Sequence, residues 1–529
     1  MKKKSIIAIA ALLTFRQVAW AQDVEWPETI GSMALNAEDS SNKYYPVSSV
    51  DNLNDLAVYV NGQGTYSTGD EETTAHTCAG LTFKLTANLD YKDKTFTPIG
   101  TGEESGSVDK PFQGIFDGAG KTISNITYTD NEGVGVGLFG YIYSPAEIRN
   151  VNLEICSFTG NSGVGAIVGN SSGYSQNFGI YDCTVASDVS VTATTDDKEN
   201  APALYAGGII GYCGYLLVSN CTSAASVSGS FCVGGIAGLL YEGTIENCFY
   251  TGNSDFSDDS KGVITGDRGN PDIADKEGTI KLTLYNDDSD AKKNADRLSY
   301  YDGIENVDVT LSGRTLSKKN EWNTLCLPFS MDATQIAAGS LNGATIKELD
   351  AENSNLATNG TLTLTFSDVS SITAGKPYIV KWASGKNISD PVFYGVTINA
   401  MAPTAVTFTN NANVYGDCEF VGQYSPFSIT DGNKNEIIML GSSSRLGYSR
   451  NERTLKCFRA HFYVPANGGG TLARAFVMDF GDGETTEIIG ATADQSSASA
   501  TYTLDGRRIN DLPTQKGMYI QNGRKVIIK

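Results

Sequence analysis

The sequence predicts an all-β protein with an N-terminal capped parallel β-helix (a β-solenoid), a β-sandwich-like domain and a small C-terminal β-hairpin unit. A glycine-rich phrase that recurs through the first half predicts the solenoid, because self-similarity at a roughly fixed period is typical of stacked units. Short alternating strands without a repeat predict the second part. Frequent Gly, Ser, Thr, Val and Tyr with scarce Pro favour strands joined by tight turns throughout.

Residues 1–21 have the pattern of a secretory signal peptide. Three lysines precede an apolar run from Ile6 to Leu13, and Ala19-Trp20-Ala21 offers a small-x-small cleavage site. The apolar run is too short to span a bilayer, and no later stretch is long and apolar enough to do so. A buried N-terminal helix is the alternative, but the order of these features favours export. The mature chain is therefore predicted to carry no transmembrane segment.

Residues 22–100 are predicted to cap the array and to lead the chain into it. Apolar residues at helical spacing predict a helix with Asp51 as its N-cap, and an alternating run after it predicts a strand. Such a cap covers strand edges that a solenoid would otherwise expose. The apolar positions are Leu53, Leu56, Ala57 and Val60 in the helix and Leu81, Phe83 and Leu85 in the strand.

Residues 101–280 carry the repeats, each with a Gly-rich first phrase and an Ile-x-Asn-apolar second phrase. We expect the inward Val, Ile and Leu side chains of each coil to stack on their equivalents in a core that no single coil could bury. Ile123 begins an earlier copy of the second phrase and is aligned with Ile148. The first phrase starts at Val136, Val164, Ala206 and Val233, and the second at Ile148, Ile180, Val218 and Ile245.

Two columns follow from the register of the second phrase. The first column is a recurring Asn or Asp, whose side chain we expect to bond to backbone amides and so to turn the chain. The alternative is that this column lines a groove for a ligand. A Cys recurs beside it. Rungs of a sheet are about 4.8 Å apart with parallel side chains, whereas a disulfide needs converging Cβ atoms about 3.8 Å apart. We therefore predict buried free thiols. The columns are Asn125, Asn150, Asp182, Asn220 and Asn247, and Cys183, Cys221 and Cys248.

Residues 281–490 are predicted to form an antiparallel, sandwich-like β domain. The repeat pattern dissolves between Asp255 and Lys293, where polar residues and Gly dominate, so a linker is placed near there. Strands separated by turn signals follow. The clearest are 325–329, 361–366, 378–382, 396–398, 437–440 and 475–478, and Cys326, Cys418 and Cys457 are expected to be buried thiols.

Residues 491–529 form the small C-terminal unit of this prediction. Gly517 to Lys529 has the pattern of a hairpin, with Asn522-Gly523 as its two-residue turn. Tyr502 to Arg508 supplies another strand and turn. So short a unit cannot enclose a large core.

Composition and motifs argue against several functions. The formal net charge of −21 makes nucleic acid and anionic membranes poor partners. Calcium is an alternative reading of the acidic segments 255–260 and 479–484, although neither has the spacing of a known calcium loop. His76 is expected in a solvated loop and His461 on a strand, satisfied by its neighbours, and no nucleophile elbow, zinc spacing or phosphate loop accompanies them. No catalytic, cofactor-binding or metal-binding residue is therefore predicted.

Three segments resemble parts of secreted or surface proteins of Bacteroidetes. The repeat phrases, preceded by Thr97–Gly100 and Phe112–Gly120, resemble the GLUG repeat and its entry segment. Residues 322–483 resemble a β-rich module found downstream in those proteins, and residues 502–529 resemble C-terminal sorting domains of type IX secretion. The resemblance implies surface display or release, with adhesin-like roles and the sorting machinery as a partner. It implies no particular ligand.

Two functions remain open. The predicted one is an exported, non-enzymatic surface or secreted protein, located at the outer-membrane exterior or released, whose solenoid binds a host-surface protein or glycan. The alternative is a polysaccharide-active β-helix enzyme, a lyase or glycoside hydrolase, which needs two carboxylates at a defined separation. Aromatic rows on exposed coils would favour binding, and paired carboxylates in a cleft would favour the enzyme.

Overall fold

The computed structural model describes residues 26–37, 42–62, 77–102, 110–173, 178–194, 205–254, 256, 261–266, 278–288, 293–412, 416–465 and 473–481, and the backbone of five C-terminal strands from residue 485 on. The predicted signal peptide 1–21, His76 and the turn Asn522-Gly523 lie outside the described residues. Strands dominate the described part and helices are few, so the predicted all-β class is confirmed.

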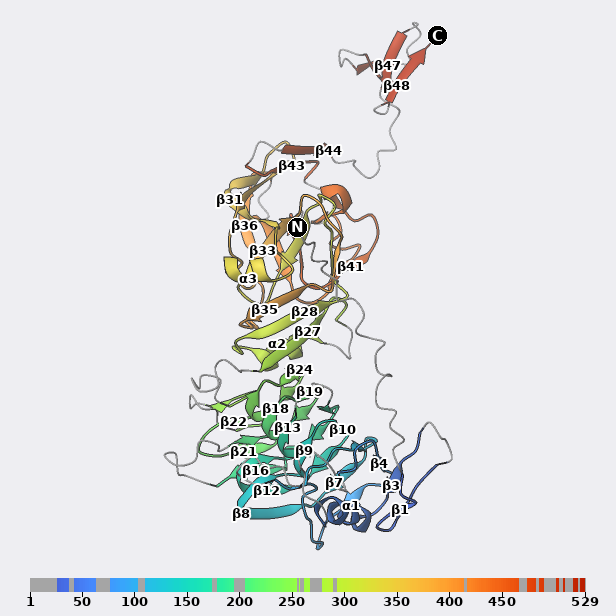
Figure 1. Ribbon diagram of the computed structural model, residues 1–529. Coiled ribbons are helices and arrows are strands. Elements are labelled where there is room, and N and C mark those ends of the chain that lie inside the picture. The colour runs from blue at the N-terminus through green and yellow to red at the C-terminus, as the bar shows by residue number, and fades with distance from the viewer. Residues whose placement is uncertain are drawn as a thin grey trace, which may run out of the picture.

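The first half of the chain passes through the same parallel sheets in every coil. The strands of each coil pair in parallel with those of the coils before and after it. These coils form the blue-to-green part of Figure 1. Because each coil repeats one order of strands, neighbouring coils bury their apolar side chains against one another.

A ten-stranded sheet carries the central apolar column. At each rung one apolar side chain is fully buried beside its equivalent in the next strand. The column is Phe83, Phe116, Ile148, Ile180, Val218, Ile245, Ile280 and Val307. The strands, in order, are β3 (Tyr45–Val47), β4 (Thr82–Leu85), β6 (Ile115–Asp117), β10 (Glu147–Arg149), β14 (Gly179–Tyr181), β19 (Leu217–Ser219), β24 (Thr244–Glu246), β27 (Thr279–Tyr285), β28 (Val307–Ser312) and the antiparallel β35 (Val392–Val396).

Three further parallel sheets complete the coils. The six-stranded one contains β25 (Phe249–Tyr250), β20 (Thr222–Ser223), β15 (Thr184–Val185), β11 (Asn152–Glu154), β7 (Thr122–Ser124) and β5 (Leu89–Asp90). The seven-stranded one contains β21 (Ser226–Ser228), β16 (Ser190–Ala193), β12 (Ser157–Gly165), β17 (Ala206–Gly207), β22 (Val233–Gly234), β26 (Lys261–Gly262) and β8 (Thr127–Val136). The four-stranded one contains β23 (Ala237–Tyr241), β18 (Ile210–Gly214), β13 (Val168–Ser172) and β9 (Phe139–Tyr143).

The strand register corrects one alignment made from the sequence. Ile148 pairs with Phe116 in the ten-stranded sheet, whereas Ile123 pairs with Leu153 in the six-stranded sheet. Ile123 therefore belongs to the following strand, and Asn125 is not part of the Asn/Asp column. The pattern misled because similar Ile-x-Asn phrases end two different strands of the coil.

The Asn/Asp column turns the chain as predicted, but mainly by another means. Asn150, Asp182, Asn220 and Asn247 have φ values between 51° and 56°, in the left-handed region that Asn and Asp tolerate best among side-chain-bearing residues. Of these four, only Asn247 accepts a hydrogen bond from a backbone amide, that of Thr283 at 2.8 Å. The expected side-chain-to-backbone bonding is therefore wrong for the other three, because the left-handed backbone itself makes the turn.

The cysteine column contains free, buried thiols, as predicted. None of the ten cysteines forms a disulfide, and all ten are buried, including Cys326, Cys418 and Cys457. Within the column, the Cys221 N–H lies 3.4 Å from Cys248 Sγ. Burial raises the pKa of the Cys183 and Cys221 thiols well above the usual value. These side chains therefore pack as small apolar residues.

Helix α1 (Val50–Gly62) lies at the N-terminal end of the array, beside β1 (Thr29–Ile30) and β3. Its buried residues include the four apolar positions expected from the sequence, Leu53, Leu56, Ala57 and Val60. The predicted N-cap is wrong. Ser49 Oγ accepts the Asn52 N–H at 3.2 Å, while Asp51 lies inside the first turn, because the helix begins two residues earlier than expected. Strand β1 pairs with β2 (Met33–Ala34).

Helix α2 (Asn294–Tyr301) covers the other end of the six-stranded sheet. Tyr301 Oη donates a hydrogen bond to the carbonyl oxygen of Cys248, at 3.0 Å. The Arg297 guanidinium lies 5.2 Å from the ring centre of Phe249 and 5.0 Å from that of Tyr285. Its Nη1 donates to Asn247 Oδ1 at 3.3 Å. Arg297 thus closes the Asn/Asp column at its last member.

The ten-stranded sheet continues where the repeat pattern dissolves. Strands β24, β27 and β28 pair in parallel, and β35 then joins β28 antiparallel. In Figure 1, β27 and β28 lie between the coils and the yellow-to-orange second part. The segment expected as a linker therefore contains a strand that belongs to the array.

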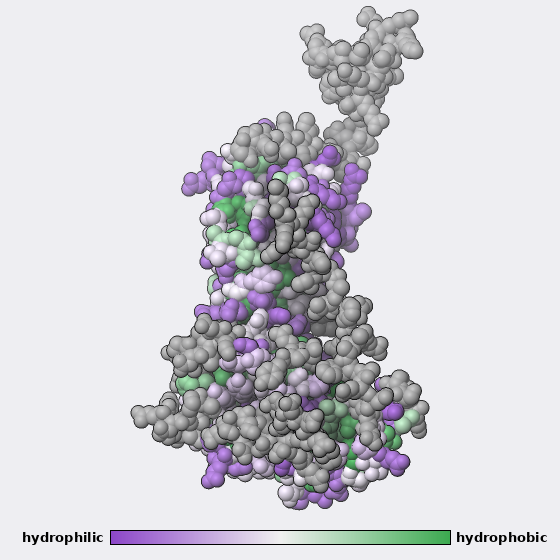
Figure 2. Space-filling view, viewed as in Figure 1, coloured by the Kyte–Doolittle hydropathy of each residue, from purple (hydrophilic) through white to green (hydrophobic). Residues whose placement is uncertain are grey.

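The second part is built around an eleven-stranded sheet, paired mostly antiparallel. Two of its pairs, β31 with β36 and β32 with β43, are parallel. The strands are β40 (Leu446–Tyr448), β39 (Ile437–Leu440), β42 (Arg459–Tyr463), β37 (Cys418–Gln423), β36 (Val406–Asn410), β31 (Thr345–Leu356), β32 (Thr361–Asp368), β43 (Ala475–Asp479), β44 (Thr485–Ile489), β30 (Asn323–Cys326) and β33 (Pro377–Lys381). Hydrophilic residues cover much of the face of this part seen in Figure 2.

Smaller elements complete the chain. Strand β29 (Thr315–Leu316) pairs with β34 (Ile388–Ser389), and β38 (Phe427–Ile429) pairs with β41 (Arg453–Leu455). Helix α3 (Ala333–Ala338) and the short 3-10 helix at Ser442–Ser444 lie in the second part. The predicted C-terminal hairpin is present as β47 (Gly517–Gln521) and β48 (Arg524–Ile528), and β45 (Thr501–Thr503) joins β47 and β46 (Arg508–Ile509).

The burial of the thiols predicts their reactivity. In the native protein we expect essentially none of the ten cysteines to react rapidly with a thiol-specific disulfide reagent at pH 8, because the thiolate form is both shielded and disfavoured. All ten should react in denaturant without reducing agent. Absorbance titration of the released thiolate measures both numbers, and a denatured count of eight or fewer would reveal a disulfide and contradict the ladder.

Candidate functional site

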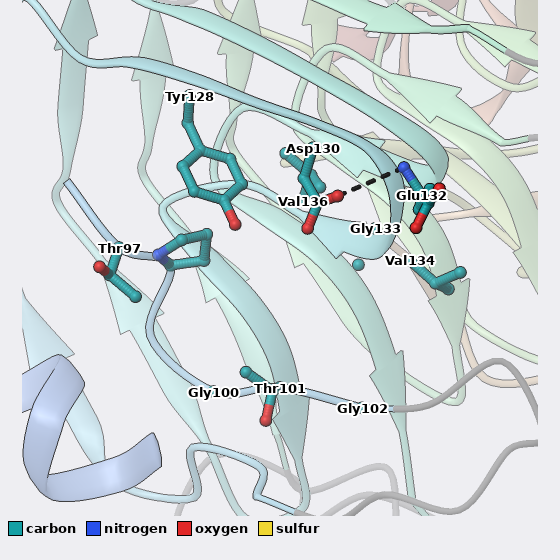
Figure 3. A pocket seen from close by; sticks show the side chains of 12 residues that line it. Thr97, Gly100, Thr101, Gly102, Tyr128, Asp130, Glu132, Gly133, Val134 and Val136 are labelled. Atoms are coloured by element: carbon teal, nitrogen blue, oxygen red, sulfur yellow. Dashed lines mark hydrogen bonds between the residues drawn. The ribbon is translucent and has the colours of Figure 1, made fainter. Parts of the chain in front are cut away.

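An open groove lies along the outer side of the first coils. Its volume is about 770 Å³. One wall is the loop from Thr97 to Gly102, and the other is strand β8 from Tyr128 to Val136. Figure 3 shows this groove from close by.

Strand β8 presents an aromatic ring and two carboxylates to the groove. Tyr128, Asp130 and Glu132 all line the groove, and the register of β8 shifts between Asp130 and Val134, so Glu132 lies in an irregular part of the strand. The Tyr128 ring is half-buried and packs edge-on against Phe96, with ring centres 6.0 Å apart. Asp130 and Glu132 are exposed, and Asp130 Oδ1 accepts the Glu132 N–H at 3.3 Å.

A row of tyrosines continues from this region across later coils. We call Tyr141, Tyr205, Tyr212, Tyr215 and Tyr241 the tyrosine row. The ring centres of Tyr205 and Tyr212 are 5.5 Å apart, those of Tyr212 and Tyr241 6.2 Å, and those of Tyr215 and Tyr241 5.6 Å. Burial raises the pKa of Tyr212, with smaller contributions from Tyr205 and Tyr241. Tyr205, Tyr212, Tyr215 and Tyr241 therefore form one cluster of contacting rings, and Tyr141 lies apart from them.

The register of the four-stranded sheet places these tyrosines. Tyr141 on β9 and Tyr212 on β18 both face Asn170 of β13, which lies between them. Gly214 pairs with Tyr241, which brings the next ring alongside. Tyr141 is buried, and the other four are half-buried, so each of the latter keeps part of its surface open to solvent.

The groove and the tyrosine row meet at Gly102. A Cβ atom at this position would lie 2.4 Å from Cδ2 of Tyr141, so the backbone of the groove wall runs directly over the Tyr141 ring. Only glycine allows this approach. The groove therefore reaches Tyr141, and Asn170 of β13 lies between Tyr141 and the other four rings.

The chemistry of this surface suits a polar ligand with flat apolar faces. Tyrosine supplies a large apolar ring and a hydroxyl group that donates and accepts hydrogen bonds. Carboxylates at Asp130 and Glu132 add acceptors at one end, and Glu242 stands beside Tyr215 at the other. Among the described residues that line the groove, none is basic.

The residues singled out in the sequence lie elsewhere. His461 is buried in β42, where its Nδ1 lies 3.1 Å from Gln423 Oε1 and its ring stacks on Phe427. Its hydrogen-bond and stacking partners are therefore neighbouring side chains, as predicted. Segment 255–260 lies almost wholly outside the described residues, and in 479–484 Asp479 Oδ1 accepts the Gly481 N–H within a turn. In the described ranges, no three or more His, Cys, Asp and Glu side chains are grouped to hold a metal ion.

Sequence reasoning missed the tyrosine row. A signal was available, because Tyr141 and Tyr212 each follow the last Gly of the first repeat phrase. The other two copies have Asn170 and Leu239 at that place, so the column is mixed. Tyr205, Tyr215 and Tyr241 come from irregular positions, and only the fold brings them to it.

Comparisons with known proteins find short or distant matches. No family model matches the chain. A segment of 112 residues is 36% identical to halomucin of Haloquadratum walsbyi, which is 20% of this chain but only 1% of the length of halomucin. A solved structure described as a "putative immunoglobulin A1 protease" from Bacteroides ovatus is 18% identical, with a TM-score of 0.31 over 50% of this chain and 70% of that one. Across the described helices, none combines the length and hydropathy of a membrane span.

The environment of His461 predicts a pH dependence. Burial lowers its pKa to about 4, below the usual 6.5. The folded state therefore binds this proton less readily than the unfolded chain. The contribution of neutral His461 to the free energy of unfolding is fully present above pH 6.5 and is lost as the pH falls from 6.5 to 4. This loss is at most about 3 kcal/mol.

Urea unfolding at pH 7.0, 5.5 and 4.0 measures this effect. His461→Phe keeps the stacking with Phe427 and removes the titrating group, so its free energy of unfolding should fall less than that of the unmodified protein between pH 7 and pH 4. Equal pH dependence in both proteins would show that His461 does not titrate as described.

Proposed function

We propose that this chain is an exported, non-enzymatic surface or secreted protein, adhesin-like, whose stacked coils form a β-solenoid that binds glycans. The single observation that carries the proposal is the tyrosine row, in which four rings are in contact across the neighbouring strands β18 and β23 and Tyr141 lies under the groove wall at Gly102. A rigid scaffold with a row of aromatic rings offers repeated contacts to an extended ligand, so weak individual contacts add up.

Export is supported by the first residues and by the charge. Residues 1–21 have the charged start, the apolar run and the cleavage pattern of a signal peptide, and the resemblance of the repeats to GLUG repeats agrees with surface location. The sandwich-like second part then carries the solenoid on the cell side or in the released protein.

The charge of the surface selects among glycans. Asp130 and Glu132 line the groove, Glu242 stands beside Tyr215, and the whole chain has a net charge of −21. Sialylated, sulfated and uronate-rich glycans carry the same sign of charge and are repelled. We therefore propose neutral glycans as the ligand class.

Binding of the mature protein to a panel of neutral and acidic polysaccharides and mucins tests this proposal. We expect binding to at least one neutral glycan, and a loss of about tenfold or more in affinity for the double variant Tyr212→Ala/Tyr241→Ala, as for central aromatic contacts in other interfaces. The matched control is Tyr394→Ala, because Tyr394 is 46% exposed on β35, away from the row. Circular dichroism checks that the variants are folded.

Two outcomes would contradict the proposal. If the double variant bound as well as the Tyr394→Ala control, the row would not be the binding surface. If no glycan, mucin or host cell bound above an inert protein, the adhesin-like function would be abandoned.

A second candidate function rests on the two carboxylates in the groove. Asp130 and Glu132 are exposed and line the groove together with Tyr128, and a polysaccharide lyase or glycoside hydrolase could use such carboxylates. The same panel decides this case when released reducing ends are measured. If Asp130→Asn and Glu132→Gln abolished the release of reducing ends while the tyrosine double variant kept it, the groove would be a catalytic site rather than a binding site.

The C-terminal segment is proposed to direct export through sorting machinery. Removing residues 491–529 is expected to leave the protein inside the cell envelope, because the segment resembles a sorting domain and contributes only a small separate sheet. Fractionation and surface labelling of cells that make either form measure the distribution. Normal surface display of the shortened protein would contradict this role.

A further inference from the structure

Two arginines lie close together where the coils meet the second part. Arg314 stands between β28 and β29 and is 5% exposed, and Arg459 begins β42 and is half-buried. Thr324 connects them, since its carbonyl oxygen accepts from Arg314 Nη2 at 2.8 Å and its Oγ1 accepts the Ala460 N–H at 3.2 Å.

Asn286 connects the same two residues from the other side. Its Oδ1 accepts from Arg459 Nη1 at 2.5 Å, and its Nδ2 donates to the carbonyl oxygen of Gly313 at 2.9 Å. Arg459 Nη1 also donates to the carbonyl oxygen of Cys457 at 3.0 Å. The two guanidinium groups are therefore held in fixed positions by neutral groups alone.

This pair lacks a negative partner. Among the described residues, no carboxylate lies within 4 Å of either guanidinium group. Arg314 Nε is fully buried and has no hydrogen-bond partner. Burial, and then the charge of Arg459, lower the pKa of Arg314 well below the usual value. Buried charges in folded proteins are paired, so this arrangement points to a missing anion.

We propose that a small inorganic anion binds between Arg314 and Arg459 and links the coils to the second part. Arg314 Nε is the free donor that faces it, and Arg459 supplies the second positive charge. Because Arg314 is 5% exposed and its Nε is fully buried, we assign an ion of the size of chloride rather than a sugar or a nucleotide. This site is independent of the glycan-binding surface.

Thermal unfolding of the full mature protein in chloride tests the site. At constant ionic strength, sodium gluconate is replaced stepwise by sodium chloride up to about 150 mM. We expect the unfolding midpoint to rise by about 1–2 °C for each tenfold increase in chloride above its dissociation constant, because an anion that binds only the folded state stabilises it. Sulfate and phosphate arms test the size of the site and should have less effect.

Three variants separate anion binding from a structural role. Arg314→Met and Arg459→Met should lose the dependence on chloride, and in gluconate Arg314→Met should unfold at the same temperature as the unmodified protein or above it, because an unpaired buried charge has been removed. The control is Arg453→Met, because Arg453 is an exposed arginine on β41, and this variant should keep the full dependence on chloride.

Equal midpoints in chloride and gluconate, or an unchanged chloride dependence in Arg314→Met, would overturn the proposal. If Arg314→Met does not fold, the chloride dependence of the Arg459→Met midpoint decides between the two outcomes.

Discussion

The whole structure depends on the parallel register that sets one buried apolar side chain above the next. From Phe83 to Val307, each rung of the ten-stranded sheet adds a fully buried residue to the same column. No single coil could enclose such a column, so each coil is stable only between its neighbours. The loops can differ in length without disturbing this column, because only the strands must stay in register. The same register places Tyr141 and Tyr212 at equivalent positions of β9 and β18.

Much of this fold could be predicted from the sequence because repeats report register directly. The free thiols of Cys183, Cys221 and Cys248 followed from the rung spacing alone, and the buried faces of α1 and β4 followed from their periodicity. The misplacement of Ile123 has the opposite cause. Two strands of one coil end in similar phrases, and only the hydrogen-bonded partner distinguishes them. The continuation through β27 was also hidden, because polar loops surround that strand in the sequence.

The candidate sites were less predictable because both arise from distant parts of the chain. Tyr141 and Tyr212 follow a repeated glycine, but Tyr205, Tyr215 and Tyr241 reach the row from irregular positions. Arg314 and Arg459 are 145 positions apart in the chain and meet only through Thr324 and Asn286. Nothing in their local sequence distinguishes them from surface arginines. The burial that makes them unusual exists only in the folded protein.

Helix α2 has a consequence for how such molecules associate. An uncovered last coil would offer β25 as a template on which the first coil of another molecule could continue the sheet, and a population of such molecules would grow into filaments. Tyr301 and Arg297 occupy that position, with their polar groups bonded to Cys248 and Asn247. With α1 at the opposite end, the number of coils is set within one chain. The six-stranded sheet therefore ends within the molecule and does not offer β25 to a neighbouring one.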